Sequence, residues 1–380
     1  MLLTAAAQSF EAKTPPLRSL HNVMPDDEWL PVSDWPLAQL GQIAEATDTP
    51  ALLLFANRAR PRWRQAVYLL LALGLAETPG AFIRRVGASA AEANSAEQLQ
   101  MMARLLPRLS PIQIISGCFQ GPPPSGLMSV LRKLDHEPLT PETYRLLVRW
   151  HEDQPGEYLR CHLMQKMVTL DQARIDAIEA LDPVLMVPAL LPFIHSKPEA
   201  ERINEVLHVI RMLCSDADPE TLRKSARELQ GVTTIRSWVE GWLRRADRLP
   251  APPFEGDDEC RPLVTGPDLE IATRRFKNCL SNRYLAPILS GKIAVVEYVA
   301  GPALALMSRL SDGHWLLVSI HAPANRPVSD ELSERVVRKV RSFGAHIHVL
   351  EKPDPKVVEV VQHVFGGFEP FDLEWQALEG

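Results

Sequence analysis

The stretch Lys292–Ala322, KIAVVEYVAGPALALMSRLSDGHWLLVSIHA, contains three short apolar runs separated by turn residues. The runs are KIAVVEYVA, ALALMSRL and HWLLVSIHA. Short apolar runs bounded by glycine, proline and polar residues are typical of strands. Gly313 lies between the second and third runs and predicts an antiparallel hairpin there. We therefore expect a partly antiparallel sheet in this part of the chain.

Helical patterns flank these runs on both sides. An amphipathic helix is expected over 269–289 and another over DELSERVVRKVRSF, 330–343. A short strand, HIHVLE (346–351), and a helix over DPKVVEVVQHVF (354–365) follow. Strands and helices in this order predict a small α/β or α+β domain.

Between Trp35 and Pro250 the apolar residues recur at helical spacing. In TPETYRLLVRWHED, Thr140 suits a helix cap and Pro141 the first helical position. Similar cap-then-proline pairs recur at steps of 29 to 42 residues. The pairs are Thr49-Pro50, Thr78-Pro79, Ser110-Pro111, Thr140-Pro141, Asp182-Pro183 and Asp218-Pro219. Such spacing suits stacked helix pairs, so we expect an α-solenoid or an irregular helical bundle.

Proline and acidic residues gather in LPAPPFEGDDECRP, from Leu249 to Pro262, and interrupt the helical pattern. The sequence thus predicts an α+β protein overall. We expect an extended arm over 1–34, an all-helical domain over 35–250, a linker over 251–262 and a smaller α+β or α/β domain over 263–380.

The composition narrows the classes of protein. A net charge of -6 argues against a chain that binds polyanions over its whole surface. Five cysteines without a CxxC pair fit neither a disulfide scaffold nor a zinc cluster, so we expect no metal and a reducing cytoplasm. The apolar segment Ala66–Ala76 is too short to span a membrane, and no secretory signal is recognisable. Nucleotide and dinucleotide motifs are absent, so no cofactor is expected.

The stretches RRFKNCLSNRY (274–284), SGKIAVVEY (290–298), PALALMSRL and IHAPANRPVSDEL (320–332) together resemble the PcfJ-like proteins. The resemblance covers about 267–343, and it implies a mobile-element or defence setting without a settled activity. This chain has Asn278 and His321 where that family often has histidine and glutamine.

From Ile271 to Val296 the chain has five basic residues and no acidic one. On a helix, Arg274, Arg275, Lys277 and Arg283 would form a strip with the amides of Asn278 and Asn282. We expect this strip to bind a phosphate-containing ligand or nucleic acid, with Asn325 and Arg326 completing the pocket. A solvated helix face is the plainer interpretation.

Cys279 falls on the apolar stripe of the same predicted helix, and a buried cysteine acts as a small hydrophobe. The alternative is a catalytic thiolate with His321 as base and Asn325 as the third group, which leaves open whether the protein is an enzyme. A third possibility is a non-catalytic adaptor. In each case the helical domain is expected to bind a protein partner, while the oligomeric state stays open.

Two other basic segments have alternative interpretations. RVVRKVRS carries Arg335, Arg338, Lys339 and Arg341, and it would extend the first strip if the two helices were neighbours. RARPRWRQ (58–65) surrounds Trp63 with four arginines. It either stacks bases and holds phosphates, or is a loop and helix start.

Overall fold

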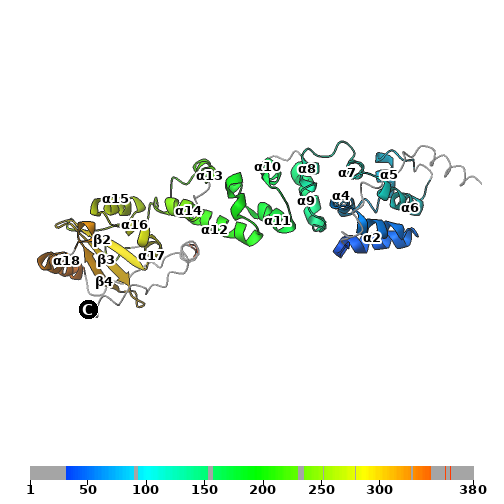
Figure 1. Cartoon of the computed structure of the whole chain (residues 1–380). Helices are drawn as coiled ribbons and strands as arrows, with labels where there is room; N and C mark the ends of the chain where they lie inside the picture. Colours follow the sequence, from blue (N-terminus) through cyan, green and yellow to red (C-terminus); the bar gives the residue numbers. More distant parts are fainter. Residues whose placement is uncertain are drawn as a thin grey trace, which may run out of the picture. The chain divides into compact units, whose positions relative to one another are not determined.

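The computed structural model describes residues 31–89, 93–152, 157–229, 235–250, 252–278, 280–326 and 328–343, with Lys356 and Val360. Helices account for the regular structure up to Leu243, and a four-stranded antiparallel sheet with further helices follows (Figure 1). The expected fold class, α+β with a helical N-terminal part, is confirmed. The chain divides into a first unit, Met1–Ala180 with Ile194–Lys197, and a second unit, Leu181–Phe193 with Pro198–Gly380.

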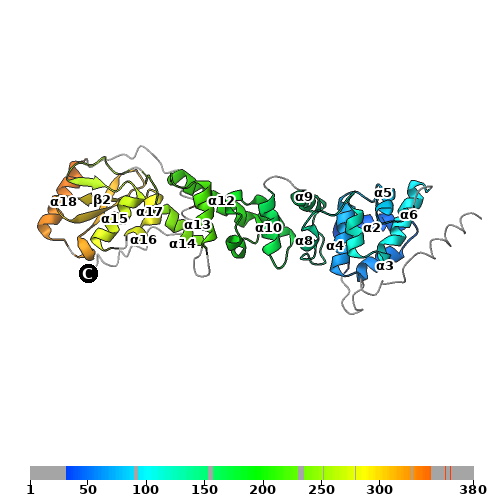
Figure 2. The same ribbon diagram turned by 90° about the horizontal axis from the view of Figure 1, so that it is seen from above.

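The first unit is a helical bundle around α4. Its elements are α2 (Asp34–Ala46), α3 (Ala51–Arg58), α4 (Pro61–Ala72), α5 (Pro79–Arg85), α6 (Ser95–Leu105), the 3-10 turn η2 (Leu106–Arg108), α7 (Pro111–Gly117), α8 (Leu127–Leu131), α9 (Pro141–His151), α10 (Tyr158–Lys166) and α11 (Gln172–Ala180). Figure 2 shows α2 to α6 gathered together. Helix α4 is buried from Trp63 onward and contacts α2, α7, α8 and α9. Solenoid repeats contact only their neighbours, so this unit is the irregular bundle of the two expected forms.

The predicted caps begin several helices. The hydroxyls of Ser110 and Thr140 accept the backbone amides of Gln113 and Thr143. Asp218 accepts two amides at the start of α13 (Pro219–Arg227). These side chains satisfy donors that have no partner within the helix, and the proline that follows each cap has no amide hydrogen to satisfy.

The arginine-rich segment before α4 is structural at two of its positions. Trp63 is 1% exposed and donates its indole N–H to the carbonyl of Leu106 at 3.1 Å, so it cannot stack on a base. Arg64 is also 1% exposed. Its guanidinium donates to the carbonyls of Asn57 (2.8 Å) and Ala59 (2.9 Å), where α3 ends. Arg64 therefore closes the C-terminal end of α3 from inside the core.

The second unit begins with helical elements and continues into the sheet. Its elements are η3 (Pro183–Leu185), η4 (Pro188–Phe193), α12 (Lys197–Leu213), α13, α14 (Ile235–Leu243), β1 (Cys260–Pro262), α15 (Gly266–Phe276), α16 (Leu280–Arg283), α17 (Leu285–Leu289), β2 (Ile293–Tyr298), β3 (Ala303–Arg309), β4 (Trp315–His321), η5 (Pro323–Asn325) and α18 (Asp330–Ser342). The segments HIHVLE and DPKVVEVVQHVF lie outside the described residues, apart from Lys356 and Val360.

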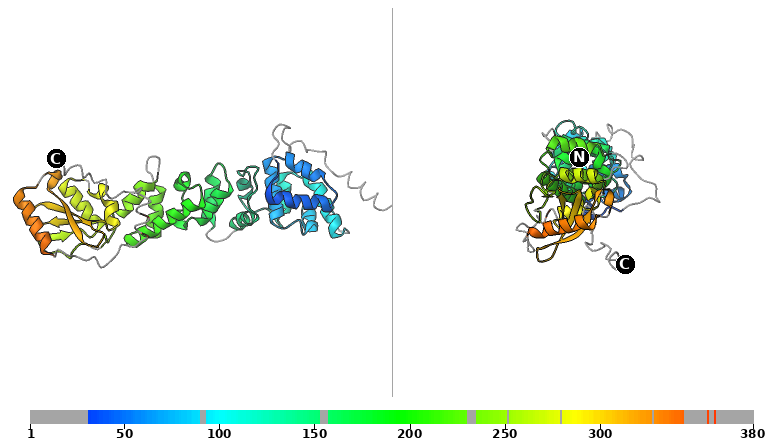
Figure 3. Two further views of the ribbon diagram at one scale, coloured as in Figure 1. Left: turned by 90° about the horizontal axis from the view of Figure 1, so that it is seen from below. Right: turned by 90° about the vertical axis from the view of Figure 1, so that its left-hand side faces the viewer.

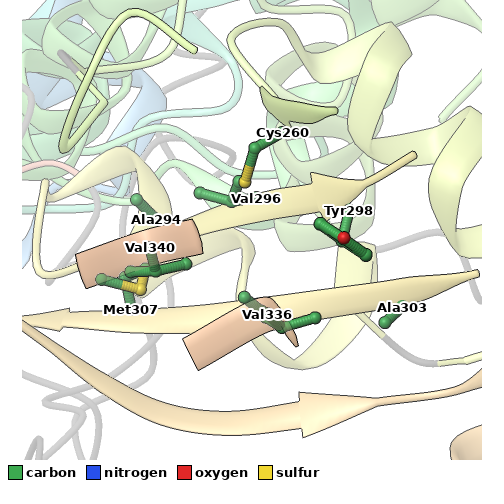
Figure 4. Packing of buried hydrophobic residues seen from close by; sticks show 9 residues of the cluster. Cys260, Ala294, Val296, Tyr298, Ala303, Met307, Val336 and Val340 are labelled. Carbon is green, nitrogen blue, oxygen red and sulfur yellow. The ribbon is translucent and has the colours of Figure 1, made fainter. Parts of the chain in front are cut away.

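The strand order is β1-β2-β3-β4, and all pairs are antiparallel. The hairpin expected at Gly313 is confirmed, and this glycine has a φ of +90°, which favours glycine. Helices α15 to α17 lie on one face of the sheet and α18 on the other (Figure 3). Figure 4 shows the core beneath α18, where Val336 and Val340 meet Val296 and Met307. The other face of β2 and β3 meets α15 to α17.

The predicted linker is held at both ends. The amide of Leu249 donates to the carbonyl of Val264 at 2.7 Å, and the amide of Gly266 donates to Ala246 at 2.7 Å. A side chain at Gly266 would come within 2.3 Å of the Arg244 carbonyl oxygen, which only glycine avoids. The described part of 251–262 thus leaves and returns to one place, and its last three residues form β1.

This segment also packs on α18. Phe254 stacks on Phe343 with ring centroids 4.1 Å apart, and Lys339 pairs with Glu259 at 2.8 Å and with Asp257 at 2.5 Å. The segment 251–262 lies within the second compact unit, Leu181–Phe193 with Pro198–Gly380. In the described parts of the chain, no helix combines the length and apolar character that a membrane crossing requires.

Substitution of Arg64 and of Arg62 should show which of these arginines stabilises the fold. Arg64→Ala leaves two carbonyls at the end of α3 without their donor and should destabilise the first unit by about 2–4 kcal/mol. Hydrogen exchange of the α3 and α4 amides reports on this unit alone. Arg62→Ala, at an exposed position, should change the same protection by less than about 0.5 kcal/mol. Equal effects of the two changes would contradict the assignment.

Candidate functional site

The segment around Cys279 is not one continuous helix, so the expectation over 269–289 is wrong. Helix α15 ends at Phe276 because Lys277 adopts a left-handed conformation with a φ of +48°. The side-chain oxygen of Asn278 accepts the backbone amide of Leu280 at 3.2 Å, where α16 begins. An asparagine that bonds local backbone in this way competes with the helix. Arg275 and Asn278 therefore do not share a helical face as predicted.

The arginines of α15 pair with acidic residues. Arg275 forms an ion pair with Glu297 of β2, whose side chain is 7% exposed, and Arg261 of β1 lies 3.6 Å from the same carboxylate. The exposed Arg274 lies 3.9 Å from Glu270 one turn earlier. Arg275 thus connects α15 to the sheet, whereas Arg274 makes a surface pair of little energetic weight.

A pocket of about 220 Å³, here called the α16 pocket, opens between α16 and the sheet. Its apolar floor is formed by Val295, Leu304 and Leu306. Besides Tyr284, three polar side chains also line it, and each of the three comes from a different part of the chain. They are Asn278 after α15, Arg283 in α16 and His321 at the end of β4. Three of the residues proposed from sequence therefore meet at one pocket.

Arg283 is the exposed cation of the α16 pocket. Its guanidinium lies 5.7 Å from the centre of the Tyr284 ring. Among the residues that the structure describes, no carboxylate lies within ion-pair distance of Arg283, in contrast to Arg274 and Arg275. Within the described residues, its charge is therefore not neutralised by a carboxylate.

His321 is half-buried and bonded within its own strand. Its Nε2 lies 2.8 Å from the hydroxyl of Ser319, two residues earlier on the same face. Burial lowers the pKa of His321 below its ordinary value, so the ring is neutral near pH 7. A neutral imidazole can accept a proton from a ligand or a thiol, and an anion bound nearby would favour its charged form.

The other residues predicted for the site do not line this pocket in the part of the chain that the structure describes. Lys277 and Arg326 are exposed, and η5, which precedes Arg326, contacts α15. Cys279 lies outside the described residues. For Asn282 and Asn325 the structure describes the backbone but not the side chain.

Sequence reasoning missed Ser319 and Glu297. Ser319 had a usable signal, because residues i and i+2 of a strand point to the same face and His321 was already a candidate. Glu297 is the acidic residue inside an otherwise apolar run, KIAVVEYVA. A carboxylate at a strand position buried on both sides requires a charged partner, although the sequence does not say which one.

The second basic segment does not extend the first. Helix α18 covers the opposite face of the sheet from α15 (Figure 3), so the two helices are not neighbours. Lys339 is also engaged by Asp257 and Glu259. The anion surface built from both helices is therefore corrected to the α15–α16 side alone.

The described cysteines are poor nucleophiles. Burial raises the pKa of Cys118 and Cys214 to about 12 and that of Cys161 and Cys260 to about 11. No group of three or more histidine, cysteine or acidic side chains suited to a metal occurs among the described residues. His346 and His348 lie outside them.

Comparisons with known proteins give no family. No family model matches the chain, and no solved structure matches it. Benzoylformate decarboxylase of Pseudomonas aeruginosa is 28% identical over 218 residues, which are 55% of this chain and 39% of the decarboxylase. The chain thus spans well under half of that relative, and this partial similarity assigns no family. The resemblance to the PcfJ-like proteins stays a prediction.

The two arginines of α15 should differ in their effect on stability. Arg275→Ala leaves the buried Glu297 with only the partly exposed Arg261 and should lower the free energy of unfolding of the second unit by about 1–3 kcal/mol. Arg274→Ala removes a surface pair and should change it by less than about 0.5 kcal/mol. Hydrogen exchange of the β2 and α15 amides measures both. Unchanged exchange of the β2 amides in Arg275→Ala would refute the role of this ion pair in connecting α15 to the sheet.

Proposed function

We propose that the C-terminal sheet domain binds a phosphate group in the α16 pocket, while the helical part of the chain binds a protein partner. One observation carries the first statement: Asn278, Arg283 and His321 converge on a pocket in which Arg283 has no carboxylate partner among the described residues. Amide and guanidinium donors are the groups that recognise phosphate oxygens.

The size of the pocket supports a small ligand group. At about 220 Å³ it lies below the roughly 300–1,000 Å³ of sites for drug-sized ligands. It is suited to one phosphate group, either free or at the end of a nucleic-acid strand, with any adjoining body outside. Lys277 and Arg326 are exposed nearby and would strengthen the local positive potential in a chain of net charge -6.

The cellular setting in this proposal comes from the resemblance. A PcfJ-like protein in a mobile element or a defence system, working in the cytoplasm, would use the helical part as a scaffold and the phosphate site as its ligand sensor. If the unchanged protein binds its partner but binds no phosphate, the adaptor role is favoured instead.

Arg283→Ala should weaken binding of inorganic pyrophosphate by about 10-fold or more, because a charge-assisted hydrogen bond is lost. Isothermal titration calorimetry measures this on the full chain. Arg274→Ala is the matched control and should bind as the unchanged protein does. Tighter binding of a 5′-phosphorylated oligothymidine than of pyrophosphate would identify a strand end as the source of the phosphate.

The pH dependence of pyrophosphate binding is a second, independent test of the phosphate site. The pKa of His321 lies below the ordinary value of about 6.5, so its ring gains a proton only in acid. Pyrophosphate binding should therefore tighten between about pH 6.5 and pH 5.5 by more than the ligand's own titration accounts for, and His321→Gln should abolish the extra gain. No effect of Arg283→Ala at either pH would refute the phosphate site.

Cysteine-dependent catalysis is a second candidate function. The residues on either side of Cys279, Asn278 and Leu280, both line the α16 pocket, as does the neutral His321. A thiol activated by this imidazole would be a nucleophile of the cysteine-histidine type.

Thiol labelling decides this candidate, because the raised pKa values of the four buried cysteines leave Cys279 as the residue able to react early. An activated Cys279 should be modified by a disulfide reagent well below pH 8.5, and Cys279→Ser should remove that reaction. His321→Ala should slow it. If no thiol reacts until the protein unfolds, Cys279 is a core residue and the second candidate fails.

A further inference from the structure

Two stretches of the first unit lack acidic residues. No aspartate or glutamate occurs from Thr49 to Ala76 or from Gln98 to Leu134, although the chain as a whole has an excess of acid. These stretches supply α3, α4, η2, α7 and α8, and α4 contacts both α7 and α8. The part of the bundle that these elements form therefore carries no acidic side chain.

An apolar groove of about 180 Å³ opens among α4, α7 and α8, and we call it the Ile112 groove. Ile112, Ile115, Met128 and Leu131 line it. Ile112 is 55% exposed. Arg62 at the start of α4 and Arg132 after α8 also line the groove, and both are exposed.

We propose that the Ile112 groove binds an acidic peptide segment of a protein partner. One apolar side chain of that segment fills the groove, and carboxylates on either side of it pair with Arg62 and Arg132. The inference rests on the partner-binding role proposed for the helical part and specifies the chemistry of the partner. It is independent of the α16 pocket.

Charge and shape favour a peptide over a nucleic acid. Arginine next to an apolar anchor pocket is the composition of binding hot spots between proteins. A nucleic-acid strand would need an exposed aromatic platform for its bases, and Trp63, the aromatic residue next to Arg62, is buried. Because the net charge of the chain is -6, this part of the bundle would also guide an acidic segment toward the groove rather than elsewhere.

The probe is a fluorescein-labelled synthetic peptide with one leucine between runs of glutamate, titrated with the full chain and followed by anisotropy. Ile112→Ser and Arg132→Glu should each weaken binding by about 10-fold. Added salt should weaken it further. The matched controls are Val168→Ser, at a side chain 88% exposed on the same unit, and Arg149→Glu, at an exposed position that does not line the groove. Neither control should alter the affinity.

Several results would overturn the proposal. They are no binding of the peptide, equal losses in the groove and control variants, or an unchanged affinity when the peptide leucine is replaced by serine. Stronger binding of oligothymidine at Arg62 and Arg132 would assign the surface to nucleic acid, and self-association lost in Ile112→Ser would assign it to a second copy of the chain. If pyrophosphate still binds through Arg283 while the peptide does not, this inference fails and the phosphate site stands. A partner that is held equally well by Arg132→Glu would keep the scaffold role and exclude the groove.

Discussion

The buried carboxylate of Glu297 constrains the whole C-terminal domain. A carboxylate removed from water is tolerated only with charged partners, and here Arg275 of α15 and Arg261 of β1 supply them. Because the two arginines come from different elements, the same carboxylate fixes α15 against the sheet and connects the edge strand to β2. The chain after α15 then has to turn at Lys277, and that turn places Asn278 and α16 above the apolar floor of the pocket.

Arginines in this chain have three different roles that composition cannot separate. Arg64 is enclosed in the helical bundle and closes α3, Arg275 neutralises a buried carboxylate, and Arg283 faces an open pocket. The distinction depends on which acceptors the fold brings near each guanidinium. A basic segment therefore indicates a binding surface only where its side chains have no acidic partner within the protein. In the segment Arg274–Arg283 this criterion excludes Arg275, which is paired with Glu297.

Local patterns predicted the parts of the fold that depend on local physics. The caps at Ser110, Thr140 and Asp218 and the turn at Gly313 follow from neighbouring residues, and the strand runs follow from apolar spacing. The break at Lys277 did not, because the amphipathic spacing continues across it and a left-handed lysine has no sequence signature. Of the candidate site, Asn278, Arg283 and His321 were predicted and do meet, whereas the floor of Val295, Leu304 and Leu306 depends on how strands and helices face each other. The position of α18 on the face of the sheet opposite α15 likewise depends on how the strands pair and not on local sequence.

The hydrogen bonds that join Leu249 to Val264 and Ala246 to Gly266 turn an apparent boundary into a closed excursion of the chain. A protease that cut this segment once, between Pro253 and Asp258, would leave the parts of the chain on either side of the cut associated through these bonds and through β1. The nicked protein would migrate as two bands under denaturing conditions and as one species under native conditions. The helices before the cut would therefore stay joined to the sheet even though the covalent link between them is broken.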